Sequence, residues 1–324
     1  MKTTDTLIAF LMVCCLLVLG GCDTVHEFPD TLPAAEQTVE IRFCFKDKAP
    51  LDEYKTISYR QLKSTAQAES YQSRFVVEVY DNGQCLVHKQ LFTDVDYDEG
   101  ISLQLRLATG KDYRIVTWVD KVASGSSTDM HYQTASLNSI ELNWDFHQAC
   151  ADHKEAFAGT LDVSLGTASD GKAVVTHTVD LYRPHAKFRI VTTDLDAYNL
   201  TGHKPPQKVK LIYLQDLPSL YHFTSSSVTT SSSEVEVWGT VCEFTENTCT
   251  LAFDWIFCPG KGITLPVVFE VYDADQKLIL RSPQIDIPLM CNKLTTVRDR
   301  FLTTRFSDGI GIDDNFEGEI SIEL

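Results

Sequence analysis

Several patterns are missing from this sequence, and each absence argues against a class of protein. No Gly-x-Ser-x-Gly nucleophile elbow occurs, and Gly260-Lys261-Gly262 lacks the upstream glycine and following helix of a phosphate loop. Basic residues are few: 28 Lys and Arg stand against 45 Asp and Glu, and the net charge of −17 argues against nucleic acid as a partner. We therefore predict a protein that is not an enzyme and that has no cofactor.

No apolar run in this sequence is long enough to span a bilayer as a helix, and this includes the run near its start. The run from Leu7 to Gly21 has about 15 residues, fewer than the ~18 to 20 that a spanning helix needs. It follows Lys2, and a positive start with a short apolar centre indicates an export signal. Its end, Leu19-Gly20-Gly21-Cys22, resembles the lipobox of bacterial lipoproteins. That resemblance implies cleavage before Cys22, acylation of Cys22, and attachment by lipid to a membrane outside the cytoplasm.

Ten cysteines allow more than one arrangement of thiols and disulfides. Cys14 and Cys15 would leave with the signal and Cys22 would take lipid, so an odd number remains and not all can pair within one chain. Cys44 and Cys85 lie in strand-like runs and are predicted to be buried thiols. Cys242 and Cys249 flank a possible hairpin tip and could bridge across it, in a compartment that permits disulfides. The other remaining cysteines are Cys150, Cys258 and Cys291.

Apolar and polar residues alternate in several short segments, which is typical of half-buried strands. The segments are 39–45, 101–107, 209–213 and 251–257, and Asp81-Asn82-Gly83 is a strong hairpin signal between two apolar runs. Long helical patterns are nearly absent, and the best candidate, 51–73, is equally compatible with a loop. The Ser- and Thr-rich stretch 224–234 is predicted to be an exposed loop. The pattern predicts an all-β sandwich or barrel.

An internal similarity indicates two domains. Residues 76–84 (VVEVYDNGQ) and 268–276 (VFEVYDADQ) are alike, and each precedes an apolar pair and then an alternating strand. Two sandwiches of similar plan, joined near Asp180 to Arg183, explain this repeat. The predicted division is a signal peptide at 1–21, a flexible tether at 22–37, an N-terminal sandwich at 38–182 and a C-terminal sandwich at 183–324.

Two groups of residues have the composition of metal sites. His147-x-x-Cys150-x-x-His153 has zinc-binding residue types, but its spacing does not bring all three to one face, so we interpret it as a polar loop. Asp313, Asn315 and Glu317 mimic the start of a calcium loop, and we interpret them as a turn before a final strand at 319–324. We predict no metal site. Trp118 and Trp255 lie in strand patterns and are predicted to be core residues.

Longer segments resemble the fimbrillin-like lipoproteins of Bacteroidetes, in particular the group related to minor, anchoring fimbrial subunits. The resemblance implies two tandem transthyretin-like (Greek-key type) β-sandwiches and a lipid anchor on the outer membrane at the cell surface. It also implies assembly with other fimbrial subunits, in which one subunit supplies a strand to a neighbour's sheet. Its residues are the lipobox, 75–81 (FVVEVYD), 113–120 (YRIVTWVD), 183–188 (RPHAKF), 292–302 and 309–312.

Two functions remain open. The first is a structural role as a fimbrial anchor or accessory subunit, in assembly or adhesion, and the second is capture of a glycan or nutrient for an outer-membrane transporter. In the stalk pilins that this chain resembles, a trypsin-like protease cuts after a basic residue near the first strand, and that strand is lost. No Lys or Arg occurs from Asp23 through Glu40, and the first candidate, Arg42, lies inside the strand pattern. We therefore expect the first strand to be retained, as in an anchor.

Overall fold

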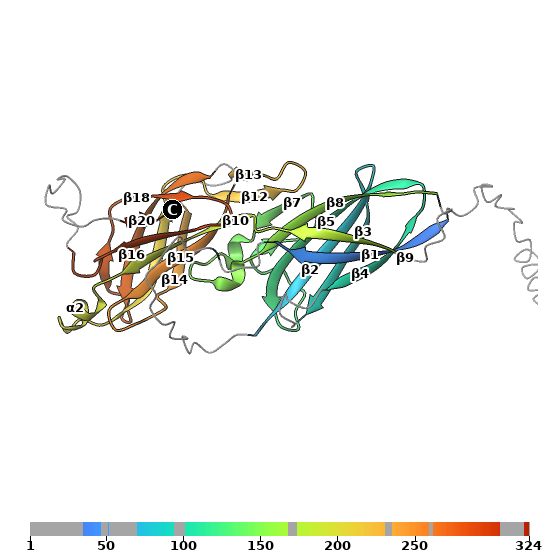
Figure 1. Cartoon of the computed structure of the whole chain (residues 1–324). Coiled ribbons are helices and arrows are strands. Elements are labelled where there is room, and N and C mark those ends of the chain that lie inside the picture. Colours follow the sequence, from blue (N-terminus) through green and yellow to red (C-terminus); the bar gives the residue numbers. More distant parts are fainter. Residues whose placement is uncertain are drawn as a thin grey trace, which may run out of the picture.

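The structure, a computed structural model, describes residues 35–46, 51, 70–93, 101–167, 174–230, 235–258, 262–304 and 321–323. Strands dominate these residues, and the all-β prediction is confirmed (Figure 1). The helical elements described are α2 (Leu195–Asn199) and the 3-10 turns η1 (Trp144–Phe146) and η2 (Asp152–Lys154). None of the described helices is long and apolar enough to cross a membrane. The predicted signal peptide, Cys22 and the 313–317 turn lie outside the described residues.

The N-terminal sandwich packs a three-stranded sheet on a four-stranded one. The first sheet has the order β4 (Ser102–Ala108), β1 (Glu36–Phe45), β9 (Val174–Leu181), and the second has the order β3 (Gln84–Thr93), β2 (Tyr71–Asp81), β5 (Lys111–Ala123), β8 (Phe157–Leu165). Alternate residues of β1 and β4, such as Ile41 and Leu103, meet Phe75 and Ile115 of the other sheet in one buried core. Asn82 and Gly83 adopt positive φ angles of 49° and 83°, which confirms the predicted hairpin.

The C-terminal sandwich repeats this plan. One sheet has the order β15 (Cys249–Phe257), β10 (His185–Thr192), β19 (Leu294–Asp299), β20 (Ser321–Glu323). The other has the order β14 (Val235–Thr240), β11 (Pro206–Tyr213), β16 (Ile263–Asp273), β17 (Leu278–Arg281), and β18 (Ile285–Leu289) also pairs with β16. In both sandwiches the first strand runs parallel to a strand from late in its half, β1 with β9 and β10 with β19. The prediction of two sandwiches is confirmed.

The repeated segments that suggested this plan do not occupy equivalent strands. Residues 76–84 lie in β2 and its turn, whereas 268–276 lie in β16 and its turn. By sheet order, β2 corresponds to β11 and β5 corresponds to β16. The similarity therefore reflects two strand-turn segments with a shared local pattern rather than aligned halves of a duplication. The two-sandwich prediction was right, but the alignment behind it was wrong.

A third sheet joins the two sandwiches. It has the order β13 (Ser227–Thr230), β12 (Pro218–His222), β7 (Ser139–Leu142), β6 (Tyr132–Gln133), so its strands come from both sides of residue 183. Strands β6 and β7 belong to the long connection between β5 and β8, residues 124–156, which we call the joining segment. Figure 1 shows β7 and β12 between the two sandwiches. The boundary at 182/183 stays a prediction, since the joining sheet crosses it.

The joining segment changes the burial of two strands. Strand β2 is buried on both faces from Ser73 to Tyr80, because its outer face lies under this segment. All nine residues of β15 are buried, although its sequence alternates. There the peptide N–H of Cys150 donates to the Phe253 carbonyl oxygen at 2.8 Å, and Lys154 reaches Asp254. The polar positions in both strands are therefore buried polar groups that need partners.

Candidate functional site

Strand β1 is the element on which the predicted mode of assembly depends. It lies between β4, antiparallel, and β9, parallel, so its backbone is paired on both sides. Val39 and Ile41 are fully buried and Phe43 nearly so. Loss of β1 would leave β4 and β9 without their common neighbour and would expose the apolar core between them. A strand of matching pattern from another subunit could fill that space.

Arg42 lies well inside β1. Its backbone is opposite Ser102 of β4 and Thr178 of β9. Its side chain is exposed and pairs with Glu40 at 3.1 Å. A protease must unpair and extend several residues of its substrate, so cleavage here requires local opening of the sheet. The structure thus confirms that the first basic residue after the tether is in paired backbone.

A buried ion pair lies where the joining segment meets the C-terminal sandwich. The Lys154 ammonium group donates to Asp254 Oδ1, and both side chains are completely buried. Asp254 also accepts a hydrogen bond from the Tyr213 hydroxyl at 2.7 Å and one from the Trp255 amide at 2.8 Å. Lys154 comes from the N-terminal half and the other three from the C-terminal half, so this cluster attaches one half to the other. Sequence analysis missed it, because no motif marks residues 100 positions apart.

Three histidines surround this ion pair and are neutral. Burial, and next the charge of Lys154, lower the pKa of His131 and of His147 to about 3. The same two causes hold the pKa of His185 well below its ordinary value. His147 Nε2 lies 3.7 Å from Asp254, but that carboxylate is already paired with Lys154, and burial outweighs its attraction. Each histidine therefore stays uncharged at neutral pH.

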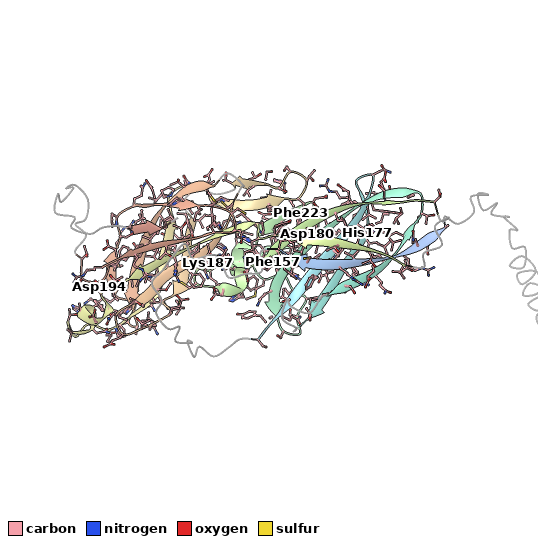
Figure 2. All side chains as sticks on the ribbon, in the orientation of Figure 1. Phe157, His177, Asp180, Lys187, Asp194 and Phe223 are labelled. Atoms are coloured by element: carbon pink, nitrogen blue, oxygen red, sulfur yellow. The ribbon has the colours of Figure 1, made fainter. Side chains whose placement is uncertain are left out.

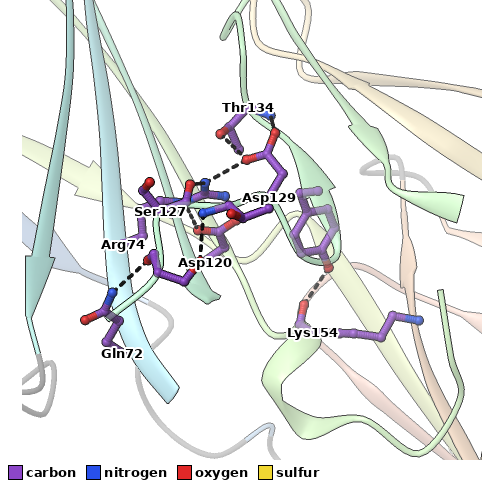
Figure 3. Close-up of polar contacts among 10 residues, drawn as sticks. Gln72, Arg74, Asp120, Ser127, Asp129, Thr134 and Lys154 are labelled. Atoms are coloured by element: carbon purple, nitrogen blue, oxygen red, sulfur yellow. Dashed lines mark hydrogen bonds and ion pairs between the residues drawn. The ribbon is translucent and has the colours of Figure 1, made fainter. Parts of the chain in front are cut away.

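A second buried network fixes the joining segment to β2 (Figure 3). Arg74 is fully buried and forms two hydrogen bonds with Asp120 of β5, at 2.9 and 2.6 Å. It also bonds Asp129 of the joining segment at 2.7 Å, and Asp129 in turn accepts from the Thr134 amide and hydroxyl. Burial lowers the pKa of Arg74, but the two carboxylates outweigh it and the net shift is upward. The guanidinium stays charged and holds the segment in place.

Glu78 makes the corresponding contact nearer the hairpin. Its carboxylate accepts from the Tyr80 hydroxyl and from the Leu137 amide at 2.8 Å, and it lies 2.8 Å from His88 Nδ1 of β3. Burial, and next Glu78, raise the pKa of Tyr80. Glu78 and Tyr80 are part of the segment 75–81 that carries the family resemblance. Their buried contacts indicate that this segment serves packing of the joining segment.

The three residues of zinc-binding types, His147, Cys150 and His153, lie apart in the structure. His147 lies near Asp254, Cys150 contacts Cys242, and the His153 ring stacks on Tyr71 with centroids 4.2 Å apart. No group of three metal-binding side chains occurs among the residues that the structure describes. Between the two histidines, Cys150 has a positive φ of 60°.

Two predictions about cysteines need correction. Cys242 and Cys249 are not joined to each other, and Cys242 contacts Cys150 instead. Cys85 is exposed rather than buried, because β3 is an edge strand with a solvent-facing side, and Cys44 is half-buried. Trp118 and Trp255 are core residues, as predicted.

The segment 183–188 lies between the sandwiches. Arg183 donates to Glu155 at 2.6 Å and to Asn292 at 2.9 Å, and its guanidinium lies 5.1 Å from the centre of the Phe157 ring. Lys187 pairs with Asp152 at 2.7 Å. Figure 2 shows Phe157 and Lys187 in the middle of the molecule. These contacts hold the segment 183–188 against the joining segment and against Asn292, which precedes β19.

One aromatic side chain is exposed on the outer face of the β14–β11–β16 sheet. Trp238 is 46% exposed, and its ring lies 5.3 Å from that of Tyr272. Lys210 lies over the Trp238 ring at 5.8 Å and pairs with Glu270 at 2.7 Å. We call these residues, with Glu236, the Trp238 face. An aromatic plane bordered by charged hydrogen-bonding groups is a surface on which a polar ligand with an apolar side can bind.

The fold of this chain is thus two β-sandwiches joined by a third sheet. Residues 33–324 match the model of a protein family described as a family of unknown function (DUF6562), and the chain belongs to that family. No curated protein matches the sequence.

Solved structures with a similar arrangement share little sequence with this chain. The fimbrial anchor protein Mfa2 from Porphyromonas gingivalis is 16% identical with a TM-score of 0.46, covering 82% of this chain and 90% of that one. A fimbrial assembly protein from Parabacteroides distasonis is 12% identical with a TM-score of 0.40, covering 84% and 93%. A candidate cell adhesion protein from Bacteroides eggerthii is 13% identical with a TM-score of 0.44, covering 83% and 86%.

Proposed function

We propose that this protein is a non-enzymatic lipoprotein of the cell surface that serves as an anchor or accessory subunit in a fimbria-like assembly or in adhesion. Its lipid would be carried by Cys22 in the outer membrane, and its partners would be other subunits that pair with its sheets. The proposal rests on the sequence resemblance to anchoring fimbrial subunits, on the lipobox, and on the position of β1.

Strand β1 is the observation that carries the choice of an anchor over a stalk subunit. It is paired on both sides, and three of its side chains are buried in the core. The preceding stretch from Asp23 through Glu40 has no basic residue. A trypsin-like protease therefore finds no basic residue before β1, and the first one along the chain, Arg42, lies in paired backbone. A chain that keeps both its first strand and its lipid stays attached to the membrane at the base of an assembly.

The test is the mass of the protein recovered from its own cells. We expect a mature chain that begins at acylated Cys22 and extends through β1. A matched variant, Ala34→Arg, places a basic residue just before β1 and reports whether a protease with this specificity reaches the protein. Cleavage of the variant after residue 34 together with an intact native chain would support the proposal. A native N-terminus at Phe43 or later would refute it, since β1 would then have been removed.

The Trp238 face favours a second function, binding of a surface glycan or nutrient. Sugar rings have an apolar side that packs on an indole, and their hydroxyl groups bond to charged side chains such as Glu236 and Lys210. Affinity electrophoresis in gels that contain bacterial or plant polysaccharides tests this function. We expect Trp238→Ala to abolish any retardation and Tyr182→Ala, which alters another exposed aromatic residue, to leave it unchanged. Equal retardation of both variants would exclude this face as the binding site.

A further inference from the structure

Cys150 is held at one open side of the C-terminal sandwich. The preceding residue, Ala149, donates its amide hydrogen to the Trp238 carbonyl oxygen of β14 at 2.9 Å, and Cys150 donates to Phe253 of β15 at 2.8 Å. Since β14 and β15 belong to opposite sheets, this short piece of the joining segment spans the gap between them. It lies so close to β14 that a Cβ atom at Gly239 would meet the Ala149 Cβ and carbonyl oxygen at 2.9 Å.

Cys242 is fixed at the same place from the other half of the chain. It follows β14 and forms an antiparallel bridge with Thr250 of β15, with hydrogen bonds of 3.0 and 2.9 Å. Both cysteines are therefore bound to the same edge of β15 through their backbones. Their side chains are in hydrogen-bond contact with each other. The positive φ of Cys150 is rare for a residue other than glycine and persists where the surroundings determine it.

We propose that Cys150 and Cys242 form a disulfide bond that covalently ties the joining segment to the C-terminal sandwich. The bond forms between the two Sγ atoms, which together lose two protons and two electrons. The electrons pass to the disulfide of a thiol–disulfide oxidase through a mixed disulfide, and the oxidase is left as a dithiol. The formation of this bond in the cell rests on the proposed export, because an oxidising compartment is required.

The surroundings of the pair determine when it oxidises. Contact with Cys150, and next burial, raise the pKa of the Cys242 thiol, so little thiolate is present once the segment has docked. Exchange needs a thiolate, so the folded dithiol reacts slowly. Oxidation is therefore fastest while the segment is still open, during folding. The bond would close a loop of about ninety residues, a size at which a cross-link restricts the unfolded chain strongly.

Peptide mapping after digestion with a glutamate-specific protease isolates the two cysteines. Cleavage after Glu141 and Glu155 gives a peptide with Cys150 alone, and cleavage after Glu236 and Glu243 gives one with Cys242 alone. The mature chain is refolded in a glutathione redox buffer, its remaining thiols are alkylated, and it is digested without reduction. We expect the two peptides to be linked. Alkylation of both Cys150 and Cys242 in the folded protein would overturn the proposal.

Thermal unfolding provides a second measurement. We expect Cys150→Ser, Cys242→Ser and the double variant each to lower the Tm of the oxidised protein by roughly 5 to 15 °C, with no additional effect in the double variant. Reductant should lower the native Tm by a similar amount and leave the variants unchanged. Cys85→Ser, at an exposed thiol, is the control and should behave like the native protein. A native Tm that does not respond to reductant would contradict the proposal even if a serine variant fails to fold.

The same mapping on protein from cells separates this proposal from the proposed function. A linked pair in the membrane fraction supports both. A soluble, non-acylated chain would refute the lipoprotein assignment, while the refolded protein would still decide whether Cys150 and Cys242 pair.

Discussion

Replacing either partner of the Lys154–Asp254 ion pair should destabilise the whole molecule. Both side chains are completely buried, so removal of one leaves an uncompensated charge in the interior, which costs about 3 to 5 kcal/mol. The two variants should differ. In Lys154→Met, Asp254 keeps the hydrogen bonds from Tyr213 and from the Trp255 amide, so we expect the lower end of that range. In Asp254→Asn, the buried Lys154 charge faces a neutral amide and the Gln148 carbonyl at 3.3 Å, with no negative charge to compensate it, so we expect the upper end.

A double-mutant cycle tests the physical reason. The variant Lys154→Met/Asp254→Asn has no buried charge at this position, so its loss of unfolding free energy should be smaller than the sum of the single losses by about 2 kcal/mol or more. Urea denaturation followed by tryptophan fluorescence measures all four proteins, since Trp255 adjoins the pair. Lys204→Met, at the exposed pair with Asp275, is the control and should change stability far less. A loss in the double variant that equals the sum of the two single losses within about 0.5 kcal/mol would refute the reasoning.

Four further predictions follow from the sequence and from the buried groups. The pKa of His131 and of His147 is about 3 in the folded protein and about 6.5 in the unfolded chain, so the unfolded chain binds more protons between these pH values. The free energy of unfolding should therefore fall as pH drops from about 6.5 toward 3, by up to about 1.4 kcal/mol per pH unit for each histidine. Urea denaturation at a series of pH values measures this fall. Lys154→Met removes a nearby positive charge and should raise both histidine pKa values, read by NMR titration, and unchanged values would contradict the role given to Lys154. Gly239→Ala forces the joining segment away from β14 and should cost about 1 to 3 kcal/mol in unfolding free energy, whereas Gly166→Ala, where a Cβ meets nothing within 4 Å, should be nearly neutral. Cys22→Ala should move the protein from the membrane to the soluble fraction, and unchanged retention in the membrane would exclude acylation of Cys22 as the anchor.

The sequence predicted strands well where one face is buried and the other is solvated. Strands β1 and β4 alternate strictly, and their buried residues are those that the alternation marks. The prediction of a half-buried strand failed for β15, because the joining segment covers a second face that periodicity cannot reveal. The same segment covers β2, whose charged residues Arg74 and Glu78 are buried and paired.

The contacts between the halves could not be predicted for a related reason. Lys154 and Asp254, or Cys150 and Cys242, lie about 90 to 100 residues apart, and nothing local to either member marks the other. The predicted Cys242–Cys249 bridge relied on short separation in sequence. In the structure, the hairpin-like stretch instead places Cys242 against the joining segment, so proximity along the chain was a poor guide to proximity in space.

The joining sheet also sets an order of events for a chain that is synthesised from its N-terminus. Strands β6 and β7 emerge well before β12, their partner in that sheet, so the N-terminal sandwich must wait for later residues before its outer face is covered. During that interval, the apolar side chains of Val76 and Trp118 lack their final surroundings. Such a nascent chain is prone to aggregate until the later residues arrive. The joining sheet thus couples the folding of the two halves, since its strands come from both.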